Sequence, residues 1–375
     1  MSSLRNKKLL FVSNDLDFFL SHRLPLAIEA EKEGYIVYVA SDKIPKKKIG
    51  NIYFKKYSIY RSSTSITKNL KSLMELKAII KEISPDIIHS ITLKSILLSN
   101  LVLLFNRKVK KVNAVSGLGY LFTSNRVSNA LFGLKFILRA LIRLGRPHFI
   151  FQNSQDLNEI KKLGLKDDYS LIKGSGVNKD EFDYFPPRGA KKINITFTGR
   201  ILKDKGVLEL IKAIEILPKE ISSKLVLNIY GKIDLENPAY ITEKELKKLL
   251  KPNFIVWHGN SNDIKNVLAL SDIYCLPSYR EGLPKSTLEA MAIGRPIVTT
   301  NAPGCEDTVL EGINGFKVDI KDYKALSEKL QLLIEDEPLR IKMGKKSREI
   351  FQKNFTLDKV VKQTFELYDS LIVKN

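Results

Sequence analysis

The sequence is poor in the residues from which disulfide frameworks and zinc sites are built. Its 375 residues include four histidines and two cysteines, Cys275 and Cys305, which form no CxxC or CxxH spacing. This arrangement excludes a zinc site and a disulfide framework, and it is typical of a protein in a reducing compartment. We therefore expect both cysteines to be buried thiols of the hydrophobic core.

Long apolar runs are also missing. The run 9–12 ends at Ser13 and is shorter than the roughly 7–15 apolar residues of a secretory signal. The longest uninterrupted candidate, 95–105, is shorter than the roughly 20 residues that a membrane-spanning helix needs. We therefore expect a cytoplasmic protein with no segment across a bilayer.

Acidic residues are absent from one long stretch of the first half. Lys and Arg number 62 against 41 Asp and Glu, a formal net charge of +21, and 87–155 contains no Asp or Glu. The basic residues within 87–155 are Lys94, Arg107, Lys108, Lys110, Lys111, Arg126, Lys135, Arg139, Arg143 and Arg146. This excess predicts an anionic partner, which by charge alone is a phosphate compound, an anionic lipid or a nucleic acid.

Short β-branched or apolar runs alternate with longer amphipathic segments, which predicts parallel βαβ units. In the first half we expect strands at 9–12, 36–40, 87–88, 109–115, 148–152 and 169–172, and helices at 20–32, 67–83, 129–144 and 155–163. In the second half we expect strands at 193–197, 225–230, 254–257, 273–276 and 296–299, and helices at 207–216, 243–250, 263–270 and 284–293.

The two series of βαβ units predict an α/β protein of two doubly wound, Rossmann-like domains, because 375 residues exceed the about 100–200 residues of one domain. A Pro-, Gly- and Lys-rich linker at 185–192 separates the domains 1–184 and 193–352, and we expect the helix within 353–375 to cross back to the first domain. Ligands of such sheets bind beyond the carboxyl ends of the strands, which predicts a site facing an interdomain cleft.

The strongest local signal is the segment 271–296, in which a strand, a tight loop and a helix follow one another. Gly282 lets the loop backbone approach a ligand, Leu283 follows it, and Pro284 suits the first turn of the helix. Free N–H groups at that helix start favour an anion. Glu281 and Glu289 flank this start, and we expect each carboxylate to accept a hydrogen bond from a sugar or ribose hydroxyl.

Glu281 and Glu289 match the E-x7-E motif of the retaining glycosyltransferases of family 4, often called group 1 glycosyl transferases, which have the GT-B fold. The resemblance implies that Glu281 contacts the donor sugar and that Glu289 contacts the ribose of the nucleotide. A second match is the strand-to-turn segment 198–206, in which Gly199 and Arg200 are followed by Lys205. In the family this Arg and Lys neutralise the leaving nucleoside diphosphate.

The resemblance is weaker elsewhere. His258 lies where the family's base-binding loop follows a strand, although an exposed histidine is an equal alternative, and Gly117 allows close backbone approach to a phosphate or sugar. Where many members carry a paired Gly after the first strand and a later His, this chain has Asn14 and Ser116. The roles of three other residues near strand ends are left open: His22, Arg23 and His89.

Asp15-Leu16-Asp17 resembles the D-x-D triplet of metal-dependent glycosyltransferases. Such triplets occur often by chance, and Arg200 with Lys205 supplies the charge that a metal ion would bring. We therefore expect no cofactor and activity in the presence of a chelator.

The segment 129–146 combines helically spaced cations with a wide apolar face. The cations are Lys135, Arg139, Arg143 and Arg146. A basic amphipathic helix of this kind lies in the headgroup plane of an anionic membrane, with a buried helix whose cations reach the surface as the alternative. We expect a peripheral protein on the inner face of the cell membrane.

The resemblance implies a retaining glycosyltransferase, and the two cations Arg200 and Lys205 predict that it is metal-independent. The resemblance implies a UDP-hexose or UDP-N-acetylhexosamine donor and a lipid-linked glycan acceptor, as in the synthesis of capsule, lipopolysaccharide or another cell-surface polysaccharide. Alternatives are a sugar-nucleotide epimerase or phosphorylase on the same fold and, from the net charge, a nucleic-acid-binding protein.

Overall fold

The computed structural model describes residues 6–60, 65–118, 129–186 and 192–373, with the side chains of 129–131 left aside. Its contacts divide the chain into two compact units. The first consists of Met1–Ser175 with Leu357–Asn375, and the second is Gly176–Thr356.

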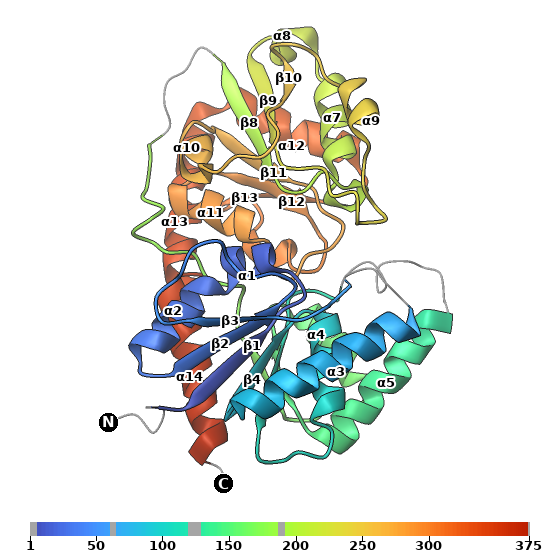
Figure 1. Cartoon of the computed structure of the whole chain (residues 1–375). Coiled ribbons are helices and arrows are strands. Elements are labelled where there is room, and N and C mark those ends of the chain that lie inside the picture. The colour runs from blue at the N-terminus through green and yellow to red at the C-terminus, as the bar shows by residue number, and fades with distance from the viewer. Residues whose placement is uncertain (1–5, 61–64, 119–128, 187–191, 374–375) are drawn as a thin grey trace. The chain divides into compact units, whose positions relative to one another are not determined.

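The first unit is built on a parallel sheet, which has seven strands over the described residues, in the order β3-β2-β1-β4-β5-β6-β7. The strands are β1 Lys8–Val12, β2 Ile36–Ser41, β3 Tyr53–Lys56, β4 Ile87–Ile91, β5 Lys110–Val115, β6 His148–Phe151 and β7 Tyr169–Leu171. The helices are α1 Leu16–His22, α2 Leu24–Lys32, α3 Ile66–Ile83, α4 Leu93–Val102, α5 Asn129–Gly145, α6 Ser154–Lys161 and, from the end of the chain, α14 Leu357–Val373. The strand order reverses direction beside β1, which defines a doubly wound fold (Figure 1).

The C-terminal helix α14 completes the core of the first unit. Val360 and Tyr368 are buried with Phe11 of β1 and Leu26 of α2 in one hydrophobic cluster. The Tyr368 hydroxyl also lies 2.5 Å from Nδ1 of the buried His89 on β4. The last helix thus belongs to the first unit, although the whole second unit precedes it in the sequence.

Local chemistry accounts for the differences from the predicted elements of this unit. The expected helix 20–32 is two helices, because the chain turns at Arg23. Pro25 lies in the first turn of α2, where a backbone N–H has no partner within the helix, so the N–H that proline lacks costs no hydrogen bond. The pattern also gave no sign of β3, because its four residues, two aromatic residues followed by two lysines, do not alternate between apolar and polar. α4 was missed because its apolar residues surround the helix instead of forming one face.

The second unit contains a parallel sheet that has six strands in the part of the chain described, in the order β10-β9-β8-β11-β12-β13. The strands are β8 Ile193–Thr198, β9 Leu225–Tyr230, β10 Ile255–Trp257, β11 Ile273–Leu276, β12 Ile297–Thr300 and β13 Gly315–Val318. The helices are α7 Val207–Glu215, α8 Lys219–Ser222, α9 Glu243–Lys247, α10 Ile264–Ala269, α11 Lys285–Ile293, α12 Tyr323–Glu335 and α13 Glu337–Asn354, with 3-10 turns at Lys203–Lys205 and Glu306–Thr308.

The boundary between the units lies earlier in the sequence than the Pro-rich segment. Val177 and Phe182 are buried in the core of the second unit, and Arg295, which is fully buried, donates to the carbonyl oxygen of Phe185 at 2.9 Å. The segment 176–185 is therefore packed onto the second unit, in place of the expected boundary at 184. Most of the expected linker 185–192 lies outside the described residues.

Two expectations about the whole chain can be compared with the structure. Cys275 and Cys305 are both free and buried, as predicted. Within the described ranges, no helix combines the length and the apolar character that crossing a membrane requires.

Candidate functional site

The central strands β8 and β11 of the second unit define the candidate site. They pair in parallel. The chain continues from β8 to β9 toward one edge of the sheet and from β11 to β12 toward the other edge. At such a reversal point the loops after the two strands diverge and leave room for a ligand. The two motifs singled out in the sequence are these loops.

The loop after β8 is held by backbone hydrogen bonds to the loop after β9. The Gly199 amide donates to the Tyr230 carbonyl at 2.9 Å, and the Ile201 amide donates to the Lys232 carbonyl at 3.0 Å. Gly231 has φ of +152°, and a Cβ there would lie 2.7 Å from the carbonyl carbon of Gly199. Only glycine therefore allows the two backbones to approach this closely.

The loop after β11 packs on the end of the loop after β8. The Tyr279 amide donates to the Asp204 carbonyl at 2.8 Å, and the Ser278 hydroxyl donates to the same oxygen at 3.1 Å. Gly206, with φ of +71°, precedes α7, and a Cβ there would lie 2.7 Å from the carbonyl carbon of Pro277. The two loops are thus fixed in register with each other.

This packing brings two predicted site residues into direct contact. The Lys205 ammonium donates to the Glu281 carboxylate, and their side chains are 18% and 13% exposed. The Glu281 amide donates to the Pro303 carbonyl at 2.9 Å, which fixes the backbone next to the carboxylate. A cation and a carboxylate that are 76 residues apart in sequence are therefore in contact at the carboxyl edge of the sheet.

A half-buried carboxylate, Asp204, lies next to this pair. Burial raises the pKa of Asp204 above its ordinary value, and the neighbouring Lys205 ammonium opposes the rise. The Asp204 carboxylate also interacts with the charges of Arg200 and Glu281. The charges of the three residues predicted to be catalytic, Arg200, Lys205 and Glu281, therefore all act on the same carboxylate, that of Asp204.

Arg200 is paired with an acidic residue that no motif in the sequence indicated. Its NH1 group lies 2.6 Å from Oδ2 of Asp234, which follows β9. The only signal in the sequence was that Asp234 lies four residues after the end of a predicted strand, and such a position does not by itself indicate a partner.

Glu289 lies within α11 and is almost completely buried. Its carboxylate accepts from the Lys285 ammonium one helical turn earlier, at 3.1 Å. Burial raises the pKa of Glu289 above its ordinary value, and Lys285 opposes this rise. Pro284 precedes the helix as its N-cap residue, one position earlier than expected, with Gly282 and Leu283 in the loop before it.

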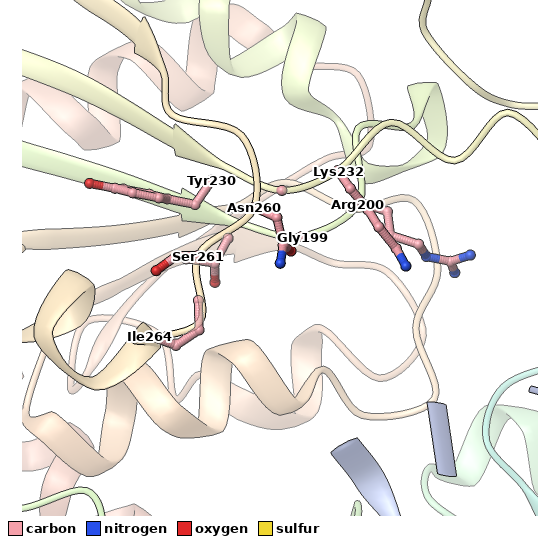
Figure 2. Close-up of a pocket in the computed structure, with 9 residues that line it drawn as sticks. Gly199, Arg200, Tyr230, Lys232, Asn260, Ser261 and Ile264 are labelled. Atoms are coloured by element: carbon pink, nitrogen blue, oxygen red, sulfur yellow. The ribbon is translucent and has the colours of Figure 1, made fainter. Parts of the chain in front are cut away.

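A small cavity opens at the ends of β8, β9 and β10, with a volume of about 190 Å³. Its lining consists of Thr198, Gly199, Arg200, Tyr230, Gly231, Lys232, Asn260, Ser261 and Ile264. Figure 2 shows the Arg200 and Lys232 side chains extending to one side of this lining and the Tyr230 ring extending to the other. The cavity is therefore cationic at one end and aromatic at the other.

The predicted residue His258 is exposed and lies beside this cavity without lining it. Its ring stacks on Tyr230 with centroids 4.4 Å apart, and its Nε2 lies 2.9 Å from Oδ1 of Asn228. Partial desolvation of its ring lowers the pKa of His258, which favours the neutral imidazole.

The remaining candidates belong to the first unit. Gly117 lies two residues after β5 and has φ of +111°, a conformation that favours glycine. Asp15 of the D-x-D triplet is the N-cap of α1 and accepts from the Phe18 amide at 3.0 Å. Among the residues described, no cluster of three or more His, Cys, Asp or Glu side chains has the arrangement of a metal site.

Cations, helix starts and carboxylates at one reversal point suit a ligand that combines phosphate groups with sugar hydroxyls, since cations bind the former and carboxylates the latter. The two doubly wound units are the GT-B architecture of glycosyltransferases, and the solved structure of HepE from Anabaena, in complex with UDP and glucose, has the same fold. Its TM-score is 0.78 at 16% identity, with 97% of this chain and 100% of that chain covered.

Residues 178–350 match the family model of the glycosyl transferases of group 1, and residues 8–153 match that of the glycosyl transferase 4-like proteins. The chain therefore belongs to the group 1 glycosyl transferases, and it is an enzyme of the glycosyltransferase class. Both the fold and the family predicted from the sequence are confirmed.

Two relatives share most of their length with this chain. One is the N,N'-diacetylbacillosaminyl-diphospho-undecaprenol alpha-1,3-N-acetylgalactosaminyltransferase of Campylobacter jejuni, 29% identical, with 94% of this chain and 98% of that protein covered. The other is the UDP-Gal:alpha-D-GlcNAc-diphosphoundecaprenol alpha-1,3-galactosyltransferase of Escherichia coli, 27% identical, with 82% and 81% covered.

Proposed function

We propose that this glycosyltransferase moves a hexose or N-acetylhexosamine from a UDP-sugar to a polyprenyl-diphosphate-linked glycan, with retention of configuration, in the synthesis of a cell-surface polysaccharide. The observation that carries the proposal is the contact between Lys205 and Glu281 at the reversal point of the second sheet, close to Arg200. The names of the two relatives support the acceptor class, and the UDP bound to HepE supports the nucleotide.

Each side chain of the site has a task that follows from its charge. Arg200 and Lys205 neutralise the diphosphate, whose negative charge grows as it leaves. Glu281, next to Lys205, accepts a hydrogen bond from a hydroxyl of the transferred sugar. Glu289 accepts from the ribose, and the cavity beside Gly199 and His258 receives the nucleotide.

The reaction needs no protein nucleophile. The bond between the anomeric carbon and the diphosphate oxygen breaks, and the acceptor hydroxyl forms its bond on the same face of the sugar. The proton of that hydroxyl goes to an oxygen of the departing diphosphate. The side chains stabilise charge and hold the reactants in place, and both effects raise kcat.

Glu281→Gln and Arg200→Ala test these roles. We expect each to lower kcat about 100-fold or more, because Arg200 stabilises the charge of the departing diphosphate and Glu281 holds the transferred sugar by a charge-assisted hydrogen bond, while the melting temperature changes little. The matched control is Glu243→Ala, which breaks an exposed ion pair with Lys247 of 2.7 Å. Normal turnover by both site variants would refute the proposal.

The assay supplies purified enzyme with UDP-sugars and a short-chain polyprenyl-diphosphate saccharide, and the product is identified by mass spectrometry and the anomeric coupling constant in its NMR spectrum. An inverted anomeric centre would contradict retention. Consumption of the donor without any glycosylated acceptor would favour an epimerase or phosphorylase instead.

We also propose that turnover requires no divalent metal, because Arg200 and Lys205 already provide the positive charge that the diphosphate needs. The expected result is an unchanged rate in excess EDTA. Loss of turnover in EDTA that Mg²⁺ or Mn²⁺ restores would reverse this proposal.

The first unit, to which we assign the acceptor, contains a surface suited to an anionic membrane. On α5, Phe132 and Phe136 are 73% and 69% exposed, whereas Leu138 and Leu141 are buried against the unit. Arg139 and Arg143 are also exposed on this helix. α5 is thus neither fully buried nor fully polar on its outer side, which is the pattern of a helix lying in the headgroup plane.

Most of the large apolar side chains that are exposed in the described part of the first unit, nine of thirteen, lie on α3, α4, α5 and the ends of these helices. They are Ile66, Leu70 and Met74, then Leu101 and Phe105, then Phe132, Phe136, Ile137 and Leu144. α4 contacts α3 on one side and α5 on the other, and Figure 1 shows α3 and α5 running along the same side of the first unit. An apolar surface with basic side chains fits a bilayer of anionic lipids.

A vesicle experiment tests the membrane proposal separately from catalysis. We expect the protein to sediment with phosphatidylglycerol vesicles at low salt and to be released at high salt. Replacing Arg139, Arg143 and Arg146 by Glu should abolish sedimentation, whereas replacing Lys342, Lys345 and Lys346 of α13 by Glu should not. Absence of binding by the unaltered protein would remove the membrane proposal and leave the glycosyltransferase assignment intact.

A further inference from the structure

The loop that contains Asp234 is fixed to the loop that contains Arg200 by backbone contacts. Beyond the ends of β8 and β9, the two segments form one more parallel bridge, between Ile201 and Ile233. Two further backbone bonds follow, from the Lys203 amide to the Ala239 carbonyl at 2.8 Å and from the Asn237 amide to the Asp234 carbonyl at 3.0 Å. The backbone on either side of the Arg200–Asp234 pair is thus immobilised.

The pair itself is unequal in exposure. The Asp234 side chain is 10% exposed, whereas that of Arg200 is 36% exposed and lines the cavity. NH1 of Arg200 donates to Asp234 at 2.6 Å. A guanidinium has five N–H donors in a rigid plane, so a bond at one edge fixes the direction in which the others point.

On the basis of the proposed function, we infer that Asp234 is a positioning residue, which holds the Arg200 guanidinium in the orientation that meets the departing diphosphate. Asp234 itself makes no contact with the donor in this role.

A double-mutant cycle tests this inference. Asp234→Ala leaves Arg200 without its partner, and we expect kcat/KM for the donor to fall about tenfold, because the rotamers of a long side chain must then be ordered during the reaction. Asp234→Asn keeps an acceptor oxygen at the same place and should retain at least a third of the activity, roughly the loss of one weak bond.

The decisive variant combines Asp234→Ala with Arg200→Ala. If Asp234 acts only through Arg200, the double variant is no slower than Arg200→Ala alone. Losses that multiply would show that Asp234 contacts the donor or acts independently, and this would overturn the inference. Glu243→Ala serves again as the neutral carboxylate control.

The outcomes also separate this inference from the proposed function. Normal activity of Arg200→Ala would refute the catalytic role of Arg200 and with it the inference. A large loss in Arg200→Ala with normal activity in Asp234→Ala would refute the inference alone. If Asp234→Ala lowers the melting temperature markedly, Asp234→Leu, which fills the same space without an acceptor, replaces it in the cycle, and the same criteria apply.

Discussion

Gly206→Ala would push the loop after β8 and the loop after β11 apart, because the added methyl group meets the backbone of Pro277. Gly206 has φ of +71°, and its position is bounded by the backbone of Pro277. A Cβ would overlap the Pro277 carbonyl oxygen and lie 2.7 Å from the carbonyl carbon, whereas ordinary contact begins at 3.4 Å. One of the two loops must therefore move by about 0.7 Å, judged from that shortfall at the carbon alone.

The energetic effect has two parts. The left-handed backbone conformation costs about 1–2 kcal/mol for any residue with a Cβ, and the overlap adds about 1–3 kcal/mol as in other overpacked sites. The free energy of unfolding should then fall by about 2–5 kcal/mol. Since Lys205 precedes Gly206 and Glu281 follows Pro277, the same movement separates their side chains. A displacement near 1 Å in a catalytic group lowers turnover by about 100-fold.

Gly312→Ala is the matched control. Gly312 also has φ of +71°, but no atom lies within 4 Å of a Cβ built there. It should lose only the about 1–2 kcal/mol of backbone strain and keep its turnover. The measurements are chemical denaturation and the initial rate of sugar transfer. Equal stability losses and equal rates in the two variants would refute the claim that contact between the loops assembles the site.

Two further predictions concern buried charges. Glu289→Gln should raise the melting temperature at neutral pH and weaken donor binding. Because the pKa of Glu289 is raised in the folded state, its ionised carboxylate destabilises the fold above that pKa. The gain in melting temperature should therefore vanish as the pH falls below the pKa of an unfolded glutamate. A gain that persists in acid would contradict this reasoning. Arg295→Met should lower the free energy of unfolding by about 3 kcal/mol or more, because Arg295 donates to the carbonyls of Leu268, Ala269 and Phe185; an unchanged denaturation midpoint would show that these bonds contribute nothing.

The sequence was sufficient for the architecture because both sheets are parallel. Strands of such a sheet are buried on both faces, so 9–12 and 273–276 are continuous apolar runs between amphipathic helices, and most predicted strands agree with the structure to within a residue or two. Residues with a local motif, such as Glu281 in its strand, loop and helix, could also be selected as candidates from the sequence. Elements without periodicity, such as α4 and β3, could not.

Pairing between distant residues was decided by tertiary structure alone. The sequence identified Lys205, Glu281 and Arg200 as candidates, but only the packing of the loop after β11 on the loop after β8 showed that Lys205 bonds to Glu281. Asp234 had no motif to mark it, because its role arises from the bridge between the loops after β8 and β9. A motif records what one short segment can do, whereas contacts between segments depend on how strands far apart in sequence become neighbours in the sheet.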